Sequence, residues 1–188
     1  MPLRIIGGTI KRKKIQTVPG RHTRPTSDRV REAIFNIIAH HQSNRHALDL
    51  FSGTGAMGLE ALSRGAVHCT FVDNSKTALT VLKKNIEICG VGERTRTINW
   101  DIGKSLACLR SSPPFDLIFM DPPYHSCLIE PALLHLHEMA VLDQGALLVI
   151  EHGADETIPE QGHDYQTMDH RRYGKTGISI LTYNHAPG

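Results

Sequence analysis

The chain has 188 residues, of which 40% are hydrophobic and 21% charged, and this suits a globular protein with one sizeable core. The net charge is only +2, but from Arg4 to Arg31 the sole acidic residue is Asp28, and this basic stretch favours a polyanionic partner. The four cysteines form no close pair, which excludes the common zinc spacings and a disulfide framework. Because no apolar stretch suits a signal peptide or a membrane span, we expect a cytoplasmic protein without a membrane partner.

Residues 3–15 are predicted to form a β-hairpin. Their apolar side chains partly alternate with Arg4, Lys11 and Lys13 on either side of Gly7 and Gly8, and glycines suit a tight turn. We therefore place a basic β-hairpin extension at residues 1–25, ahead of a main domain at residues 26–188.

A helix is predicted to follow, because apolar residues recur at helical spacing from Val30 to Ile38. Arg24 and Arg29 flank its start, where free backbone N–H groups favour an anion, so together they are candidates for holding a phosphate. The alternative is structural: Asp28 offsets the unfavourable charge of the arginines at the positive end of the helix dipole.

Strands and helices alternate through the rest of the chain. Apolar strands are predicted at 47–51, 67–73, 96–101, 115–121 and 146–151, with helices at 57–63, after Ser75, and at 105–110 and 128–140. This alternation indicates a parallel sheet with helices on both faces. Segments 165–172 and 178–183 lie too close together for a helix between them and must pair antiparallel. We expect an α/β fold with a mostly parallel seven-stranded sheet and an antiparallel C-terminal hairpin.

A glycine-rich loop, GTGAMG at residues 53–58, joins the first strand of this sheet to a helix. It fits the GxGxxG pattern, and Asp73 ends the next strand, which together are typical of a nicotinamide dinucleotide site. Asp49 argues against that ligand, because its carboxylate would repel a pyrophosphate and suits a cationic ammonium. Asp121, which opens an Asp-Pro-Pro-Tyr motif, ends another strand. These acidic residues outline one crevice at the carboxyl edge of the sheet.

The chain resembles the S-adenosylmethionine-dependent methyltransferases of Rossmann-like fold that modify exocyclic amines of nucleobases, through DLFSGTGAMGLEALSRGA, FVDNS and FDLIFMDPPY. Within them it is similar to the RsmD family, through RIIGG, RPTSDRVREAIFNII and RRYGKTGIS. The resemblance covers nearly the whole chain and implies an rRNA (guanine-N2)-methyltransferase that modifies a specific guanine of 16S rRNA. One departure is Arg12, where the basic hairpin of the family has a glycine.

The resemblance implies S-adenosyl-L-methionine as the cofactor. The glycine loop would wrap its methionine part, Asp49 would face the ammonium and Asp73 would accept the ribose hydroxyls. Asp101 would accept from the adenine amine beside the N–H of Ile102; alternatively, Asp101 is only a helix cap. The residues assigned to the cofactor are Asp49, Ser52, Gly53, Thr54, Gly55, Gly58, Asp73, Asn74, Asp101 and Ile102.

The chemistry assigned to Asp121, Pro122, Pro123 and Tyr124 follows from the target. An aromatic amine is a poor nucleophile until acceptors hold its hydrogens, and the Asp121 carboxylate and the Pro122 carbonyl supply two. Both prolines stiffen the loop, and the Tyr124 ring can stack on a base. Cys127 is expected to be a buried helix residue and not a nucleophile.

The expected partner is 16S rRNA, within the assembled or assembling 30S subunit, bound by a monomer. Phosphate contacts are assigned to Arg4, Lys11, Arg12, Lys13, Arg24, Arg29, Arg171, Arg172 and Lys175. We expect no metal site, because the histidine pairs at 40–41 and at 135 and 137 lack acidic or cysteine partners at ligand spacing.

Two other classes of function stay open. The DPPY motif is shared with DNA adenine-N6 and cytosine-N4 methyltransferases, but the chain leaves no room for a sizeable target-recognition domain. A non-enzymatic RNA-binding module on a degenerate core is disfavoured, because the glycine loop and DPPY are both intact.

Overall fold

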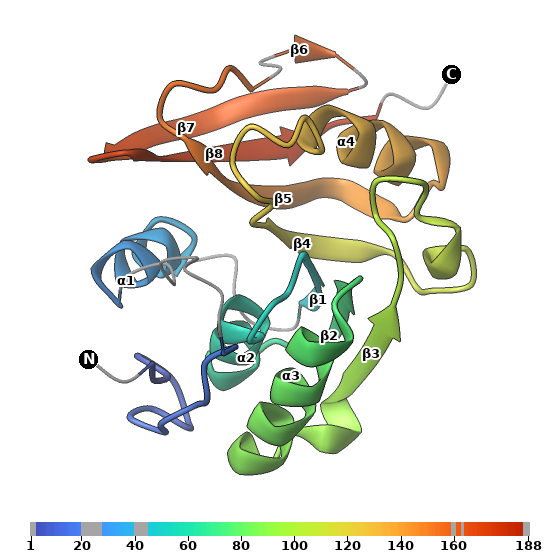
Figure 1. The fold of residues 1–188 in the computed structure, drawn as a ribbon. Coiled ribbons are helices and arrows are strands. Elements are labelled where there is room, and N and C mark those ends of the chain that lie inside the picture. The colour runs from blue at the N-terminus through green and yellow to red at the C-terminus, as the bar shows by residue number, and fades with distance from the viewer. Residues whose placement is uncertain (1–2, 20–27, 40–44, 159–160, 163, 186–188) are drawn as a thin grey trace.

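The structure is a computed structural model, and it describes residues 3–19, 28–39, 45–158, 161–162 and 164–185 (Figure 1). The helices are α1 (Asp28–Ile37), α2 (Ala56–Ser63), α3 (Lys76–Cys89) and α4 (Ile129–Glu138), with 3₁₀ turns η2 (Gly92–Arg94) and η3 (Ala107–Leu109). The strands are β1 (His46–Leu50), β2 (His68–Asp73), β3 (Thr95–Asn99), β4 (Phe115–Met120), β5 (Leu142–Gly153), β6 (Gln161–Gly162), β7 (Tyr165–Tyr173) and β8 (Thr176–Tyr183).

These strands form one sheet in the order β3-β2-β1-β4-β5-β8-β7-β6. Strands β1 to β5 are parallel to one another, whereas β8 pairs antiparallel with both β5 and β7. Strands β8 and β7 extend the sheet beyond β5 (Figure 1). The predicted fold class is confirmed, except that the two-residue β6 pairs with the edge of β7 and makes the sheet eight-stranded. The strand order reverses between β1 and β4, and ligands of such sheets bind at the carboxyl ends beside that point.

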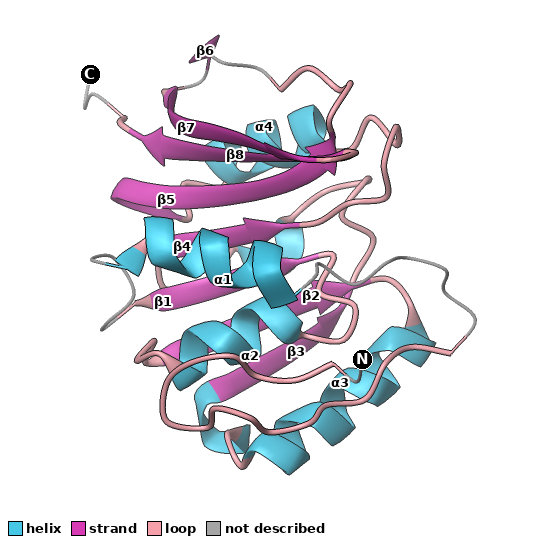
Figure 2. Ribbon diagram, turned by 90° about the vertical axis from the view of Figure 1, so that its left-hand side faces the viewer, coloured by secondary structure: helices cyan, strands magenta, loops and turns pink. Residues whose placement is uncertain are grey.

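Both faces of the sheet are covered, because alternate residues of the central strands point into opposite cores. In β4, Leu117 and Phe119 join one core, while Ile118 and Met120 join the other. Helices α1, α2 and α3 cover the first face and α4 covers the second (Figure 2). Burial on both faces explains why these strands read as continuous apolar runs in the sequence.

Local sequence sets both ends of α3. The Ser75 hydroxyl accepts a hydrogen bond from the Ala78 N–H at 3.2 Å, which confirms a predicted cap. Gly90 ends the helix with φ 69, in the left-handed region that glycine favours. The helix is thereby held over β2 and β3 with its N-terminus at the carboxyl edge of the sheet.

The N-terminal extension doubles back antiparallel, as predicted, but it forms one isolated bridge, between Arg4 and Lys14, instead of two regular strands. The cause is a competing partner, since the Glu60 carboxylate of α2 accepts from the Ile6 and Gly7 N–H groups, both at 2.7 Å, and the Ser63 carbonyl accepts from the Thr9 N–H at 2.7 Å. Backbone groups that bond to a helix are withdrawn from a hairpin ladder.

Apolar side chains join this extension to the main domain. Leu3, Ile5 and Ile15 are buried in the same core as α1, α2 and α3. Arg12 has φ 71, a left-handed conformation that glycine adopts more readily, which agrees with the glycine that the family resemblance leads us to expect at this position. The domain boundary predicted at residue 25 lies outside the described residues and stays a prediction.

Two predicted elements were wrong in extent. The helix expected at 105–110 is only the turn η3, whose hydrogen bonds from Leu109 to Leu106 and from Arg110 to Ala107 are those of a 3₁₀ helix. The strand expected at 146–151 begins at Leu142, since Phe115 pairs with that residue before the register shifts. Across the described ranges, no helix combines the length and apolarity needed to cross a bilayer.

Candidate active site

The loop between β1 and α2 turns through left-handed backbone at Gly53 and Gly55, with φ values of 53 and 77. A Cβ on Gly55 would lie 2.3 Å from Leu82 Cδ1, and one on Gly58 would lie 2.4 Å from the Phe71 ring. Close packing of α2 against β2 and α3 therefore requires glycine at both positions. This packing holds the first turn of α2, with its free backbone N–H groups, at the carboxyl edge of the sheet.

Two aspartates, each 3% exposed, hold this loop by its backbone. Asp49 accepts from the Gly58 N–H at 3.0 Å. Asp73 accepts from the Gly53 N–H at 2.8 Å and from the Ser75 N–H at 2.7 Å. The structure thus brings the predicted cofactor residues of β1 and β2 to one loop.

Asp49 is poised to change its charge. Burial raises its pKa to about 8; the Gly58 N–H opposes this shift, and the Asp73 carboxylate adds to it. A cation placed beside Asp49 would favour its ionised form. The site therefore suits a ligand that brings a positive charge.

Ser52 lies in the same loop and is 7% exposed, and its hydroxyl has no hydrogen-bond partner within the described part of the chain. A buried hydroxyl without a partner is unfavourable, so this atom indicates a place for a ligand group. The neighbouring Thr54 carbonyl accepts from Asn85 Nδ2 at 2.9 Å, which fixes the loop against α3.

A pocket of ≈ 460 Å³ opens at the carboxyl ends of β2 and β3, lined by Asn74, Asn99, Trp100, Asp101 and Lys104. Asp101 accepts from the Gly103 N–H at 3.2 Å, so it has a local structural role, yet its side chain is 45% exposed. Ile102 points its side chain into the core. Sequence reasoning missed Trp100, the protein's one tryptophan, whose ring is 37% exposed beside Asp101 and could stack on an adenine.

A second, narrow cleft lies at the carboxyl ends of β1, β4 and β5. Its lining brings Asp49 and Met57 of the glycine-loop region together with Asp121 and Glu151. The glycine loop and the Asp-Pro-Pro-Tyr segment, far apart in the sequence, therefore meet at the point where the strand order reverses.

The segment after β4, residues 121–124, is anchored by its last residue. The Tyr124 hydroxyl donates to Glu151 Oε1 at 3.2 Å and lies 2.9 Å from Thr176 Oγ1. Burial raises the pKa of Tyr124 to about 12, and the Glu151 and Asp121 carboxylates add to this shift, so the phenol stays neutral near pH 7. The residue is nevertheless 41% exposed, which leaves ring surface for contact with a base.

Glu156 holds the same end of this segment through the next residue and was missed by sequence reasoning. Its carboxylate accepts from the His125 N–H at 2.9 Å and from the Gly153 N–H at 2.6 Å. It thereby ties the residue after Tyr124 to the end of β5. No motif marks Glu151, Glu156 or Thr176, and only their contacts with the segment reveal them.

The prediction that Cys127 is a buried helix residue was wrong, whereas its expected lack of a nucleophilic role stays a prediction. This residue is exposed and has φ 55, and it lies ahead of α4, not within it. A left-handed residue cannot continue a right-handed helix, so α4 begins only at Ile129.

The basic residues assigned to RNA fall into separate places. Arg171 and Arg172 lie in β7, and Lys175 lies in the turn before Thr176, all exposed and close to the anchor of Tyr124. Lys11, Arg12 and Lys13 lie in the N-terminal turn that contacts the end of α2, at the opposite edge of the sheet. Of these two described groups, only the tail group, Arg171, Arg172 and Lys175, lies beside the crevice.

Asp28 forms ion pairs with Arg4 at 2.9 Å and with Arg31 at 3.0 Å. These contacts fit the structural alternative, in which Asp28 offsets nearby positive charge. Arg29 is exposed, and Arg24 lies outside the described residues. A phosphate site at this helix end therefore stays a prediction.

Known proteins match this chain over most of its length. A family model described as "Conserved hypothetical protein 95" matches residues 3–182. Bacillus subtilis YlbH is 35% identical over 95% of this chain and 97% of its own. Ribosomal RNA small subunit methyltransferase D of Haemophilus influenzae is 36% identical over 83% of this chain and 81% of its own. The solved structure of Escherichia coli yhhF has a TM-score of 0.85 and 31% identity, and the match covers 99% of this chain and 100% of that one. The chain therefore belongs to the conserved hypothetical protein 95 family, which is the RsmD family of Rossmann-like methyltransferases.

Proposed function

We propose that this protein is an S-adenosyl-L-methionine-dependent methyltransferase that methylates the N2 amine of a specific guanine in 16S rRNA. The observation that carries the proposal is the meeting of the glycine loop with Asp121 in one cleft at the switch point of the sheet. Family membership supports it, because relatives are named ribosomal RNA small subunit methyltransferase D.

The residues present fit the cofactor. The unpartnered Ser52 hydroxyl and the loop backbone would face its methionine part, and Asp49 would pair with its ammonium. The pocket beside Asp73 would take the adenosine, with Trp100 and Asp101 against the adenine. When bound, S-adenosylmethionine supplies an electrophilic methyl group on sulfur.

Asp121 would receive the target amine. Its exposed carboxylate lies at the end of β4, and the Pro122 carbonyl follows it in a segment stiffened by two prolines. Two acceptors on the N–H groups direct the nitrogen lone pair toward the methyl carbon, so positioning supplies much of the acceleration. The neutral Tyr124 ring, held by its hydroxyl, would stack on the guanine.

Basic groups beside the cleft would hold the RNA. Arg171, Arg172 and Lys175 are exposed next to the Tyr124 anchor, where phosphates flanking an extruded base would pass. We further propose that a monomer acts in the cytoplasm. Its substrate would be the assembled or assembling 30S subunit, whose RNA backbone extends beyond the phosphates that Arg171, Arg172 and Lys175 can contact.

The test is incubation of the protein with labelled S-adenosylmethionine and either 30S particles, free 16S rRNA or duplex DNA. The proposal predicts label in RNA and none in DNA. Label confined to DNA would favour the amino-methyltransferases of DNA that share the DPPY motif. RNA binding without any label would favour a non-enzymatic module.

A further inference from the structure

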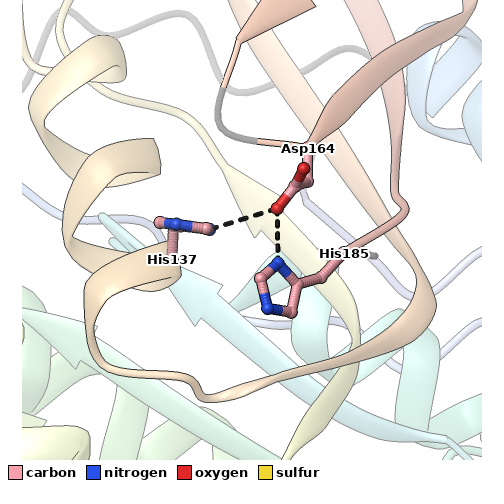
Figure 3. A group of neighbouring side chains, drawn as sticks. All are labelled: His137, Asp164 and His185. Carbon is pink, nitrogen blue, oxygen red and sulfur yellow. Dashed lines mark hydrogen bonds and ion pairs between the residues drawn. The ribbon is translucent and has the colours of Figure 1, made fainter. Parts of the chain in front are cut away.

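Three side chains with metal-binding atoms meet where β8 ends (Figure 3). His137 lies in the last turn of α4, Asp164 directly precedes β7, and His185 follows β8. One ligand atom from each lies within 4.8 Å of the other two. Figure 3 shows the two imidazoles pointing at the same carboxylate from different elements.

This cluster lies far from the proposed active site. Thr176, at the start of β8, pairs with Gly153 at the carboxyl end of β5, whereas Thr182 pairs with Leu147 further back along that strand. The end of β8 is therefore at the opposite edge of the sheet from the crevice. Whatever the cluster binds does not belong to the methyl-transfer site.

The spacing is close to that of a coordination shell. Asp164 Oδ2 accepts from His185 Nδ1 and lies 3.9 Å from His137 Nδ1. Ligands of a tetrahedral zinc ion with bonds of 2.0–2.1 Å are about 3.3 Å apart. Side-chain rotations alone could bring the three atoms to that spacing.

The backbone around the cluster is already held in place. The Asn184 N–H donates to the Asp164 carbonyl at 2.8 Å, which fixes the residue before His185 beside the carboxylate. The Tyr183 hydroxyl lies 3.1 Å from His137 Nδ1, and this hydrogen bond is given up when that nitrogen binds an ion. A pre-positioned set of ligands loses less conformational entropy when an ion binds.

We propose that His137, Asp164 and His185 bind one Zn²⁺ ion, with water as the fourth ligand. Two imidazoles and one carboxylate are a donor set that zinc uses in proteins and that calcium and magnesium do not favour. The ion links α4, the start of β7 and the residue after β8, so it is a structural clip on the C-terminal strands. Sequence reasoning expected no metal because it weighed only histidines close together in the chain.

The experiment is zinc titration of the full chain after removal of metals with a chelator. We expect one zinc ion per chain, bound with micromolar or tighter affinity and raising the melting temperature. His185→Ala should weaken binding at least about tenfold and abolish the rise in melting temperature. This exposed residue follows the last strand, so its replacement leaves the core intact.

Two further variants sharpen the result. Asp164→Asn should weaken zinc binding as His185→Ala does. His125→Ala is the matched control, because His125 is an exposed histidine that lies 3.8 Å from one carboxylate, that of Asp155. This control variant should bind zinc as tightly as the natural protein. No zinc binding below about 1 mM, or equal binding by His185→Ala and the natural protein, would overturn the proposal and leave an ordinary hydrogen-bonded cluster.

Discussion

The glycine loop and the Asp-Pro-Pro-Tyr segment meet in one cleft, yet they are held in different ways. Asp49 and Asp73 hold the glycine loop from strands on either side of it, and α2 and α3 pack directly against it. The segment at 121–124 is held from the C-terminal part of the chain, by Glu151, Glu156 and Thr176. The proposed donor site is thus built from its own neighbourhood, whereas the acceptor site depends on β5, on the loop after it and on the start of β8.

This difference predicts that the acceptor site can fail while the cofactor site stays intact. Changes in the groups that hold residues 121–124 should impair transfer and leave cofactor binding intact, whereas changes in the glycine loop should impair both.

Replacing Asp121 with Ala should lower the rate of methyl transfer by about 10²–10³-fold, the usual loss when one polar group that stabilises a transition state is removed. Cofactor affinity should not change, because Asp121 is exposed at the end of β4 and does not hold the glycine loop. Single-turnover rates and cofactor titration measure the two effects. An undiminished rate would refute the role of Asp121 as an acceptor of the amine.

Replacing Gly58 with Ala should destabilise the fold by about 1–3 kcal/mol, because the new Cβ would meet the Phe71 ring in a filled core. Cofactor binding should weaken as well, since the start of α2 must shift. Urea unfolding and cofactor titration check this result. Gly92→Ala is the control, because no atom lies within 4 Å of a Cβ there; equal stability of the two variants would contradict the packing described here.

Replacing Glu156 with Gln should lower the transfer rate by about tenfold, a loss of about 1.4 kcal/mol for one broken charge-assisted hydrogen bond. The amide can accept from only one of the two N–H groups that the carboxylate holds. Cofactor affinity should stay the same, and a parallel loss of affinity would mean that the two sites are not separate. Asp155→Asn, at an exposed neighbouring residue, is the matched control.

Cofactor affinity should rise by up to about tenfold from pH 6 to pH 7. Burial raises the pKa of Asp49 to about 8, so the free protein holds this carboxyl protonated, and pairing with an ammonium must release the proton. By the same shift, the free protein binds more protons folded than unfolded, and its stability should fall as the pH rises from about 4 to 8. Calorimetry in buffers of different ionisation enthalpy measures how many protons are released when the cofactor binds. If the Asp49→Asn variant kept the pH-dependence of affinity, another group would be its source.

Sequence predicted those parts of the molecule whose causes are local. The glycines of the loop at 53–58, Asp49 and Asp73 lie in strands and turns that follow one another in the sequence and pack together. Their position at the carboxyl edge of the sheet and their proximity to one another could therefore be predicted. Glu151 and Glu156 could not be foreseen, because their partners come from a segment that only the sheet order brings near. The single bridge of the N-terminal extension was missed for a similar reason, since its N–H groups bond to α2, which is distant in the sequence. The 3₁₀ turn at 107–109 was also missed.

The basic residues show the same limit. Composition predicted a basic N-terminal stretch with a polyanionic partner, but not its place: the contact of Thr9 with Ser63 places Lys11 and Lys13 toward the edge opposite the crevice. Their charge can still serve a large RNA particle, which would extend past the edges of this sheet.

Mass mapping of 16S rRNA after reaction with 30S particles and labelled S-adenosylmethionine is the most direct test of the proposed function. We predict a single labelled nucleotide, a guanine whose methyl group is on N2, and no label with the Asp121→Ala variant. A methyl group on a ring nitrogen, on a ribose or on another base would contradict the proposed role of the Asp-Pro-Pro-Tyr segment.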